Sequence, residues 1–175
     1  MNLGSRKGDV KASRFYALMF VALSGVLGMV LPPDLALMVA QAQTIQDRKV
    51  EADRLLDMGI EARRASQYQN AIESDLNALA ICRELKDRDC EGRAYNGLGL
   101  GYYYLGQYEK AIEFQLQRLA IAREIKDRSG EGKALGNLGI AYYSLGKYDK
   151  AIEFQLQSLE LAREIKDRRG EGAAL

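Results

Sequence analysis

Residues 131–170 read EGKALGNLGIAYYSLGKYDKAIEFQLQSLELAREIKDRRG, and the segment directly before them is nearly the same. Residues 91–130 match this segment at 27 of 40 positions, including the unbroken run KAIEFQLQ in both copies. Residues 51–90 form a third, more divergent copy, which matches residues 91–130 at 16 positions. A period of about 20 to 50 residues is typical of stacked supersecondary units rather than of one globular core. The question of function is therefore what such an array holds.

Each copy carries two apolar stripes with helical spacing. The first stripe of the middle copy consists of Ala94, Leu98, Tyr102 and Leu105. The second stripe consists of Ala111, Ile112, Leu116, Leu119, Ala122 and Ile125. Between them, Gly106 is predicted to take the left-handed conformation that ends helices. Asp87, Asp127 and Asp167 precede the first helices and are predicted N-caps.

Two helices cannot bury both apolar stripes alone, so the sequence predicts antiparallel helical hairpins that stack. Gly59, Gly99 and Gly139 recur within the first helix of each copy. A glycine inside a helix costs about 1 kcal/mol relative to alanine, so its repetition indicates close helix packing. The glycine spacings that imitate a dinucleotide fingerprint follow no strand, and they do not indicate a nucleotide site.

Residues 1–42 lie outside the repeats. A positively charged start, an apolar segment at 15–31 and the sequence Ala40-Gln41-Ala42 are the parts of a secretory signal peptide. We expect cleavage after Ala42, with residues 43–50 as a short linker. The alternative is an uncleaved membrane anchor, because the apolar segment is at the lower limit of about 17 residues for a spanning helix. Both interpretations place the repeats outside the cytoplasm.

Composition excludes several classes of function. The chain has 25 Lys and Arg against 24 Asp and Glu, so it lacks the basic excess of a nucleic-acid-binding protein. It contains no His, which removes imidazole chemistry and every His-containing metal site. We expect no catalysis, no cofactor and no metal.

The repeated pattern of Leu138-Gly139, Tyr142, Gly146, Tyr148 and Ala151 resembles the tetratricopeptide repeat. The resemblance covers residues 51–175 and implies an all-α, right-handed solenoid with repeats at 51–90, 91–130 and 131–170. The period of that family is about 34 residues, and the extra length here lies in the second helix. Long-period repeats are similar to those of Pins-type scaffolds and kinesin light chain. Where the family has an aromatic residue late in the second helix, this sequence has Asp75, Gln115 and Gln155.

The resemblance implies a peptide-holding groove along the inner face of the solenoid. Residues opposite Leu98 and Tyr102 on the first helix, at about 100° per residue, are expected to line it. The candidate residues are Arg93, Asn96, Leu100, Tyr103, Tyr104, Lys133, Asn137, Ile140 and Tyr143. Aromatic, amide and cationic groups together suit an extended protein or peptide segment. Tyr103 and Tyr143 have a second interpretation, in which they pack against the neighbouring hairpin.

Two features of the sequence argue against a groove that binds a carboxylate group of the ligand strongly. Asn137 comes one position after the place that corresponds to Asn96, so the asparagines are out of phase. Arg93 and Lys133 form a cationic row, but Asp53 interrupts it.

Cys82 and Cys90 take the places of Ala122 and Gly130 in the next copy. Two interpretations remain open for them. They are either two small buried side chains or, in an oxidising compartment, a disulfide across the turn.

Residues 171–175 read EGAAL, in phase with EGKAL at 131–135, so they open the first helix of a further repeat. We expect the chain to be a fragment or the product of a truncated gene, with an uncapped end that promotes self-association. The sequence predicts a non-catalytic scaffold that binds protein segments outside the cytoplasm. The alternative is the recruiting arm of a larger enzyme, because signal-bearing arrays of this kind are similar to those that precede a CHAT protease-like domain in bacteria, especially cyanobacteria.

Overall fold

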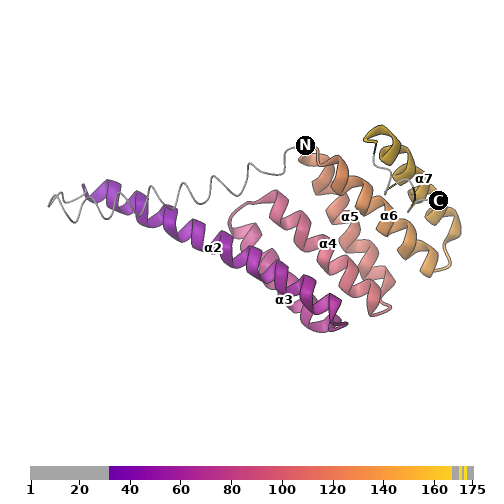
Figure 1. Ribbon diagram of the computed structural model, residues 1–175, viewed down its shortest axis with the longest axis horizontal. Coiled ribbons are helices and arrows are strands. Elements are labelled where there is room, and N and C mark those ends of the chain that lie inside the picture. The colour runs from indigo at the N-terminus through magenta and orange to yellow at the C-terminus, as the bar shows by residue number, and fades with distance from the viewer. Residues whose placement is uncertain (1–31, 167–169, 171, 173–175) are drawn as a thin grey trace. The chain divides into compact units, whose positions relative to one another are not determined.

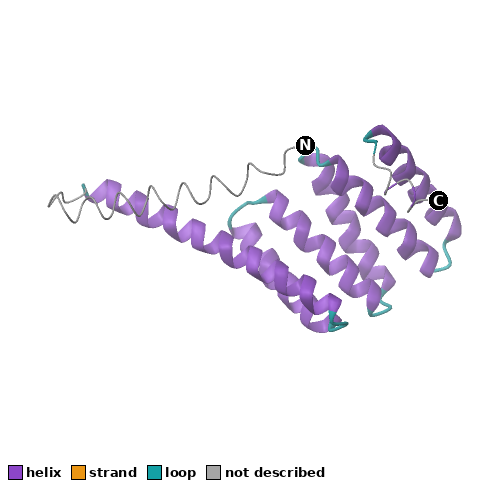
Figure 2. Ribbon diagram, in the orientation of Figure 1, coloured by secondary structure: helices purple, strands orange, loops and turns teal. Residues whose placement is uncertain are grey.

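The computed structural model describes residues 32–166, together with residues 170 and 172. Six α-helices and no strand occur in this part of the chain (Figures 1 and 2). Their bounds are α2 Pro33–Arg64, α3 Tyr68–Glu84, α4 Arg88–Tyr104, α5 Tyr108–Glu124, α6 Arg128–Ser144 and α7 Tyr148–Glu164. Each of the helices α3 to α6 packs against the next one in the sequence. The predicted all-α array of helical hairpins is confirmed.

Two units divide the chain, Met1–Thr44 and Ile45–Leu175. The described part of the first unit consists of Pro32 and the first residues of α2, and its side chains from 33 to 44 are exposed. None of the helices in the described residues is both long and apolar enough to span a membrane. The apolar segment 15–31 lies outside the described residues. Residues 43–50, predicted as a short linker, are helical and belong to α2.

A ladder of ion pairs repeats with the period of the sequence. Arg88 bonds to Glu124 at 2.9 Å, and Arg128 pairs with Glu164 at the same position of the next hairpin. Arg48 of α2 pairs with Glu84 in the same way. The repeat pattern therefore extends upstream of residue 51, into the segment predicted as a linker.

An aspartate directly precedes each of the helices α4 and α6. Asp87 accepts a hydrogen bond from the Cys90 amide at 3.1 Å, and Asp127 accepts one from the Gly130 amide at 2.9 Å. A short acceptor satisfies amides that have no partner in the first turn of a helix. The N-caps predicted at Asp87 and Asp127 are confirmed, and Asp167 lies outside the described residues.

Left-handed residues end the helices at every turn of the array. Gly106 has φ of +73°, as predicted, and Gly146 has φ of +70°. Ser66 takes the same conformation in the first hairpin, although a Cβ makes it less favourable there. Between hairpins the left-handed residue is the lysine of each KDR segment, namely Lys86, Lys126 and Lys166.

The core lies between neighbouring helices. Ala94 and Leu98 are fully buried, as their stripe predicts. The stripes also predict Leu105 and Leu116 in this core, but they are 37% and 41% exposed. Leu105 follows the end of α4, where the chain turns away. Leu116 is rotated by about 100° from Gln115, and Gln115 is the residue that takes the buried position.

The glycines repeated in the first helices lie against polar side chains. A Cβ on Gly99 would overlap Nε2 of Gln115, and a Cβ on Gly59 would lie 2.5 Å from Oδ1 of Asp75. At Gly139 the nearest atoms belong to Gln155, at 2.8 Å. The predicted close packing at these glycines is confirmed.

A disulfide between Cys82 and Cys90 joins the end of α3 to the start of α4. Their Cα atoms are 5.4 Å apart, and the two side chains are 0% and 7% exposed. Of the two interpretations that the sequence left open, the structure contains the bridge.

An ion pair closes the next junction, between α5 and α6. Nη2 of Arg118 lies 2.5 Å from Oδ2 of Asp127, and the arginine is 7% exposed. Its guanidinium covers Gly130 so closely that a Cβ there would overlap Nη2. Ala78 occupies the position of Arg118 in the preceding hairpin. Successive junctions are therefore closed by different chemistry, first covalent and then ionic.

Candidate partner-binding groove

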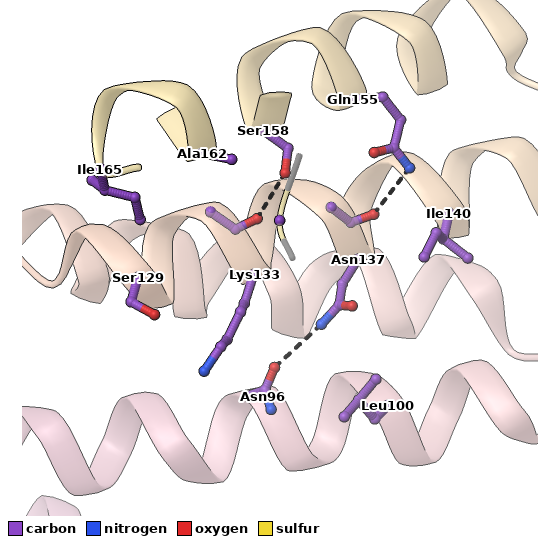
Figure 3. Close-up of a pocket in the computed structure, with 13 residues that line it drawn as sticks. Asn96, Leu100, Ser129, Lys133, Asn137, Ile140, Gln155, Ser158, Ala162 and Ile165 are labelled. Atoms are coloured by element: carbon purple, nitrogen blue, oxygen red, sulfur yellow. Dashed lines mark hydrogen bonds between the residues drawn. The ribbon is translucent and has the colours of Figure 1, made fainter. Parts of the chain in front are cut away.

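The helices α4 and α6 present side chains to a common hollow. Figure 3 shows Asn96 and Leu100 on α4 beside Lys133, Asn137 and Ile140 on α6. A cavity of about 340 Å³ lies among these five residues and α7. We call these five residues the groove. The structure thus brings together five of the nine residues that the sequence predicted for partner binding.

Two asparagines form the centre of the groove. Nδ2 of Asn137 donates a hydrogen bond to Oδ1 of Asn96 at 3.2 Å (Figure 3). In the sequence the two asparagines are one position out of phase. The structure shows that they meet, with Asn137 of α6 beside Asn96 of α4 (Figure 3). The residue in phase with Asn96 is Gly136, and a Cβ there would instead face Ser158 of α7 at 3.5 Å. The pair leaves one amide NH2 and one carbonyl oxygen without another side-chain hydrogen bond in the described residues.

The cationic row is only partly available to a ligand. Arg93 lies at the edge of a neighbouring cavity of about 190 Å³, and its Nη1 bonds to Asp53 at 2.7 Å. Lys133 borders both cavities, and no salt bridge holds it in the described part of the chain. Asp53, which interrupts the cationic row in the sequence, therefore forms an ion pair with Arg93. Within the described residues, Lys133 is a cation that faces the groove and forms no salt bridge, although Asp127 is near enough to interact with it electrostatically.

The tyrosines do not form the aromatic row that the sequence predicted for the groove. Tyr103 packs on the core of the following hairpin, where Oγ of Ser144 donates to its hydroxyl at 3.4 Å. Tyr104 stacks on Tyr68 of α3, with ring centroids 5.0 Å apart. Tyr143 is 66% exposed at the edge of a separate cavity beside α7. For Tyr103 the packing interpretation is the one that the structure supports.

A buried ion pair lines the cavity of about 190 Å³. Asp75 of α3 is fully buried and pairs with Arg63 of α2, which is mostly buried itself. Burial raises the pKa of Asp75 to about 6, although the positive charge of Arg63 opposes this shift. No pattern in the sequence places Asp75 beside Arg63. The sequence feature that could have indicated this ion pair is the acidic Asp75 at a position where the next copies have the neutral Gln115 and Gln155.

Two polar side chains of α7 line the 340 Å³ cavity on the side away from α4. Nε2 of Gln155 donates to the Gly136 carbonyl at 3.5 Å, and Oγ of Ser158 donates to the Gly132 carbonyl at 3.1 Å (Figure 3). In the described residues no group of three or more His, Cys, Asp or Glu side chains is placed to hold a metal ion. The arrangement offers hydrogen-bonding groups, one lysine and apolar walls to a ligand.

A stack of helical hairpins with mixed polar and apolar side chains along one side defines a helical-repeat protein. The family model described as tetratricopeptide repeat matches residues 51–124 and 119–164. The chain belongs to the tetratricopeptide repeat family. Domains of this family generally act as scaffolds for protein–protein interaction.

Solved structures agree with this assignment. The chain is similar to the tetratricopeptide domain of Arabidopsis FLU, with 30% sequence identity and a TM-score of 0.64 over 69% of this chain and 99% of that chain. It is also similar to the N-terminal domain of stress-induced protein-1 from C. elegans, with 20% identity and a TM-score of 0.55 over 69% and 95% of the two chains. The second likeness supports the fold alone. No curated protein matches the chain at a significant level.

Proposed function

We propose that the array is a non-catalytic scaffold that holds an extended segment of a partner protein in the groove. The observation that carries this proposal is the Asn96–Asn137 pair at the wall of the 340 Å³ cavity. The two amides keep free donors and a free acceptor, and the backbone of an extended peptide offers the complementary groups. Leu100 and Ile140 flank the pair and supply apolar surface for the side chains of the ligand.

The proposal extends to the compartment. The disulfide between Cys82 and Cys90 is consistent with an oxidising environment, because thiols are kept reduced in the cytosol. The charged, apolar and small-residue segments within residues 1–42 also support export of the chain from the cytoplasm. An extracytoplasmic location, with cleavage after Ala42 or with an uncleaved anchor, is therefore part of the proposed function.

Selection from a library of displayed random peptides tests the groove. The expected result is a set of peptides whose affinity falls about tenfold or more for a variant with Asn96→Ala and Asn137→Ala, because each lost hydrogen bond costs about 1 kcal/mol. Fluorescence anisotropy with a labelled peptide gives the dissociation constants.

The matched control changes two exposed residues of α5, Glu113→Ala and Gln117→Ala, and it should bind like the unchanged chain. Circular dichroism must show equal helicity for all three proteins. Peptides that bind the asparagine variant as tightly as the unchanged chain would remove the groove from the mechanism.

A further inference from the structure

The cavity of about 190 Å³ that adjoins the groove is lined by side chains of five helices, α2 to α6. Four of these side chains are cationic, and one is acidic. The acidic one, Asp75, pairs with Arg63, so these two residues bring no net charge to the cavity. The other cations are Arg93 of α4, Arg118 of α5 and Lys133 of α6, and we call the space that they line the cationic cavity.

The counter-charges of these three cations lie outside the lining of the cationic cavity. Asp53 bonds to Arg93 at 2.7 Å, but the two side chains are 59% and 43% exposed. An ion pair that is this open to water contributes little, so Arg93 is available to a second anion. Lys133 forms no salt bridge in the part of the chain that the structure describes. The lining therefore carries an excess of positive charge.

Arg118 is the member of this set that helix packing does not explain. It is only 7% exposed, and its Nη2 lies 2.5 Å from Oδ2 of Asp127. Its Nη1 is buried as well and has no hydrogen-bond partner among the described residues. A buried charged donor without an acceptor is unfavourable, and native proteins contain few of them. Ala78 and Ser158 occupy the same position in the other two hairpins, so the fold does not require an arginine here.

Asn96 adds a neutral donor to the cationic cavity. Because its Oδ1 accepts the hydrogen bond from Asn137, its Nδ2 remains a donor for another acceptor. Asn96 and Lys133 line both this cavity and the 340 Å³ cavity of the groove, so the two spaces adjoin. The three cations and this amide nitrogen offer donors, which suits an oxyanion as the ligand.

We propose that the cationic cavity binds a phosphate group. A phosphate group carries a charge of about −1.5 to −2 at pH 7 and several acceptor oxygens, which match three cations and an amide better than the single charge of a carboxylate does. Arginine is well suited to phosphate, because its guanidinium donates to two oxygens at once. The volume of about 190 Å³ is below the range of roughly 300 to 1,000 Å³ that is typical of pockets for larger ligands, so it suits one small group. This site goes beyond the proposed function, because it binds phosphate without the partner segment.

Isothermal titration calorimetry of the full chain with inorganic phosphate, in a chloride buffer of low ionic strength, tests the proposal. We expect saturable binding with one-to-one stoichiometry. The variants Lys133→Gln and Arg118→Ala should each weaken binding by about tenfold or more, because each removes a charge-assisted hydrogen bond. Lys133 is exposed, so its variant keeps the test valid even if the loss of the buried Arg118 disturbs folding.

Lys110→Gln is the matched control. It removes one positive charge from an exposed position of α5 outside the cationic cavity, and this variant should bind phosphate like the unchanged chain. Circular dichroism must show equal helicity for the proteins that are compared.

A titration with phenyl phosphate distinguishes the two sources of the group. Tighter binding of this monoester than of inorganic phosphate indicates the phosphate of a larger molecule, whereas equal or weaker binding indicates free phosphate, and both results support the site. The absence of saturable binding by either compound overturns the proposal. So does an unchanged affinity of the Lys133→Gln variant, an equal loss in the Lys110→Gln variant, or acetate that binds as tightly as phosphate. None of these titrations contains a peptide, so their outcome is independent of whether the groove holds a partner segment.

Discussion

At the scale of single residues, the described hairpins share a contact between a glycine of the first helix and a polar side chain of the second. Gly59, Gly99 and Gly139 lie against Asp75, Gln115 and Gln155, so the contact recurs at the same two positions of every hairpin. The sequence indicated the glycines as packing sites and contained the unusual polar residues, but it did not pair them. The pairing depends on how the two helices of a hairpin are rotated, and helical periodicity alone does not define that rotation.

Gly99→Ala should lower the free energy of unfolding by about 1 to 3 kcal/mol, because the added Cβ overlaps the buried side chain of Gln115. Gly132→Ala is the matched control, because its Cβ would meet Leu161 at an ordinary distance of 3.6 Å. This second change should be neutral or stabilising by up to about 1 kcal/mol, through helix propensity alone. Urea denaturation followed by circular dichroism measures both. Equal effects of the two substitutions would contradict the packing assigned to Gly99.

Asp75 should make stability depend on pH. In the unfolded chain its carboxyl group ionises near its ordinary pKa of 3.8, whereas in the folded array the pKa is about 6. The folded state therefore binds the proton more tightly, and the stabilisation is complete below pH 3.8 and is lost as the pH rises through 6. The loss is on the order of 3 kcal/mol.

An Asp75→Asn variant isolates this effect from the other carboxyl groups. Free energies of unfolding are measured between pH 4 and pH 7 for both proteins, and the unchanged chain should lose stability relative to the variant across this range. Two curves that remain parallel would show that Asp75 does not titrate in this range.

The elements of the array are joined at junctions that differ in chemistry. Cys82 and Cys90 bridge α3 to α4, whereas Arg118 and Asp127 connect α5 to α6. In the sequence both cysteines replace small residues, and this alone is equally consistent with free thiols. Whether two cysteines at this separation can bond depends on the turn between them, which the structure supplies.

Replacing Cys82 by Ala and Cys90 by Gly gives this junction the residues that the next one has. The free energy of unfolding should fall by about 2 kcal/mol, because the unfolded chain loses its crosslink, while the helices persist. Reductant should lower the stability of the unchanged chain by a similar amount and leave the variant unaffected. An unchanged chain that is insensitive to reductant, with two thiols that react after denaturation alone, would contradict the bridge.

Much of the array was accessible from the sequence, because its period repeats every constraint in register. Helix order, the caps at Asp87 and Asp127 and the left-handed Gly106 all followed from local chemistry. The groove was predicted less completely. Helical periodicity places Tyr103 and Asn96 both opposite the core stripe of α4. Only the position of the next hairpin shows that Tyr103 packs against it while Asn96 lines the groove.

At the scale of the whole molecule, the first helix of the described array differs from the first helices of the later hairpins. α2 carries the exposed residues Arg54, Asp57 and Glu61 at the positions where α4 has small residues. The self-association that the sequence predicted through uncapped ends stays a prediction.

The central claim is that the groove between α4 and α6 holds the partner. The most direct measurement is an NMR titration of the labelled array with a selected peptide. The account predicts chemical-shift changes concentrated at the side-chain amides of Asn96 and Asn137 and at the backbone of Leu100, Lys133 and Ile140. Changes confined to the exposed surfaces of α5 or α7, with the two asparagine amides unmoved, would contradict it.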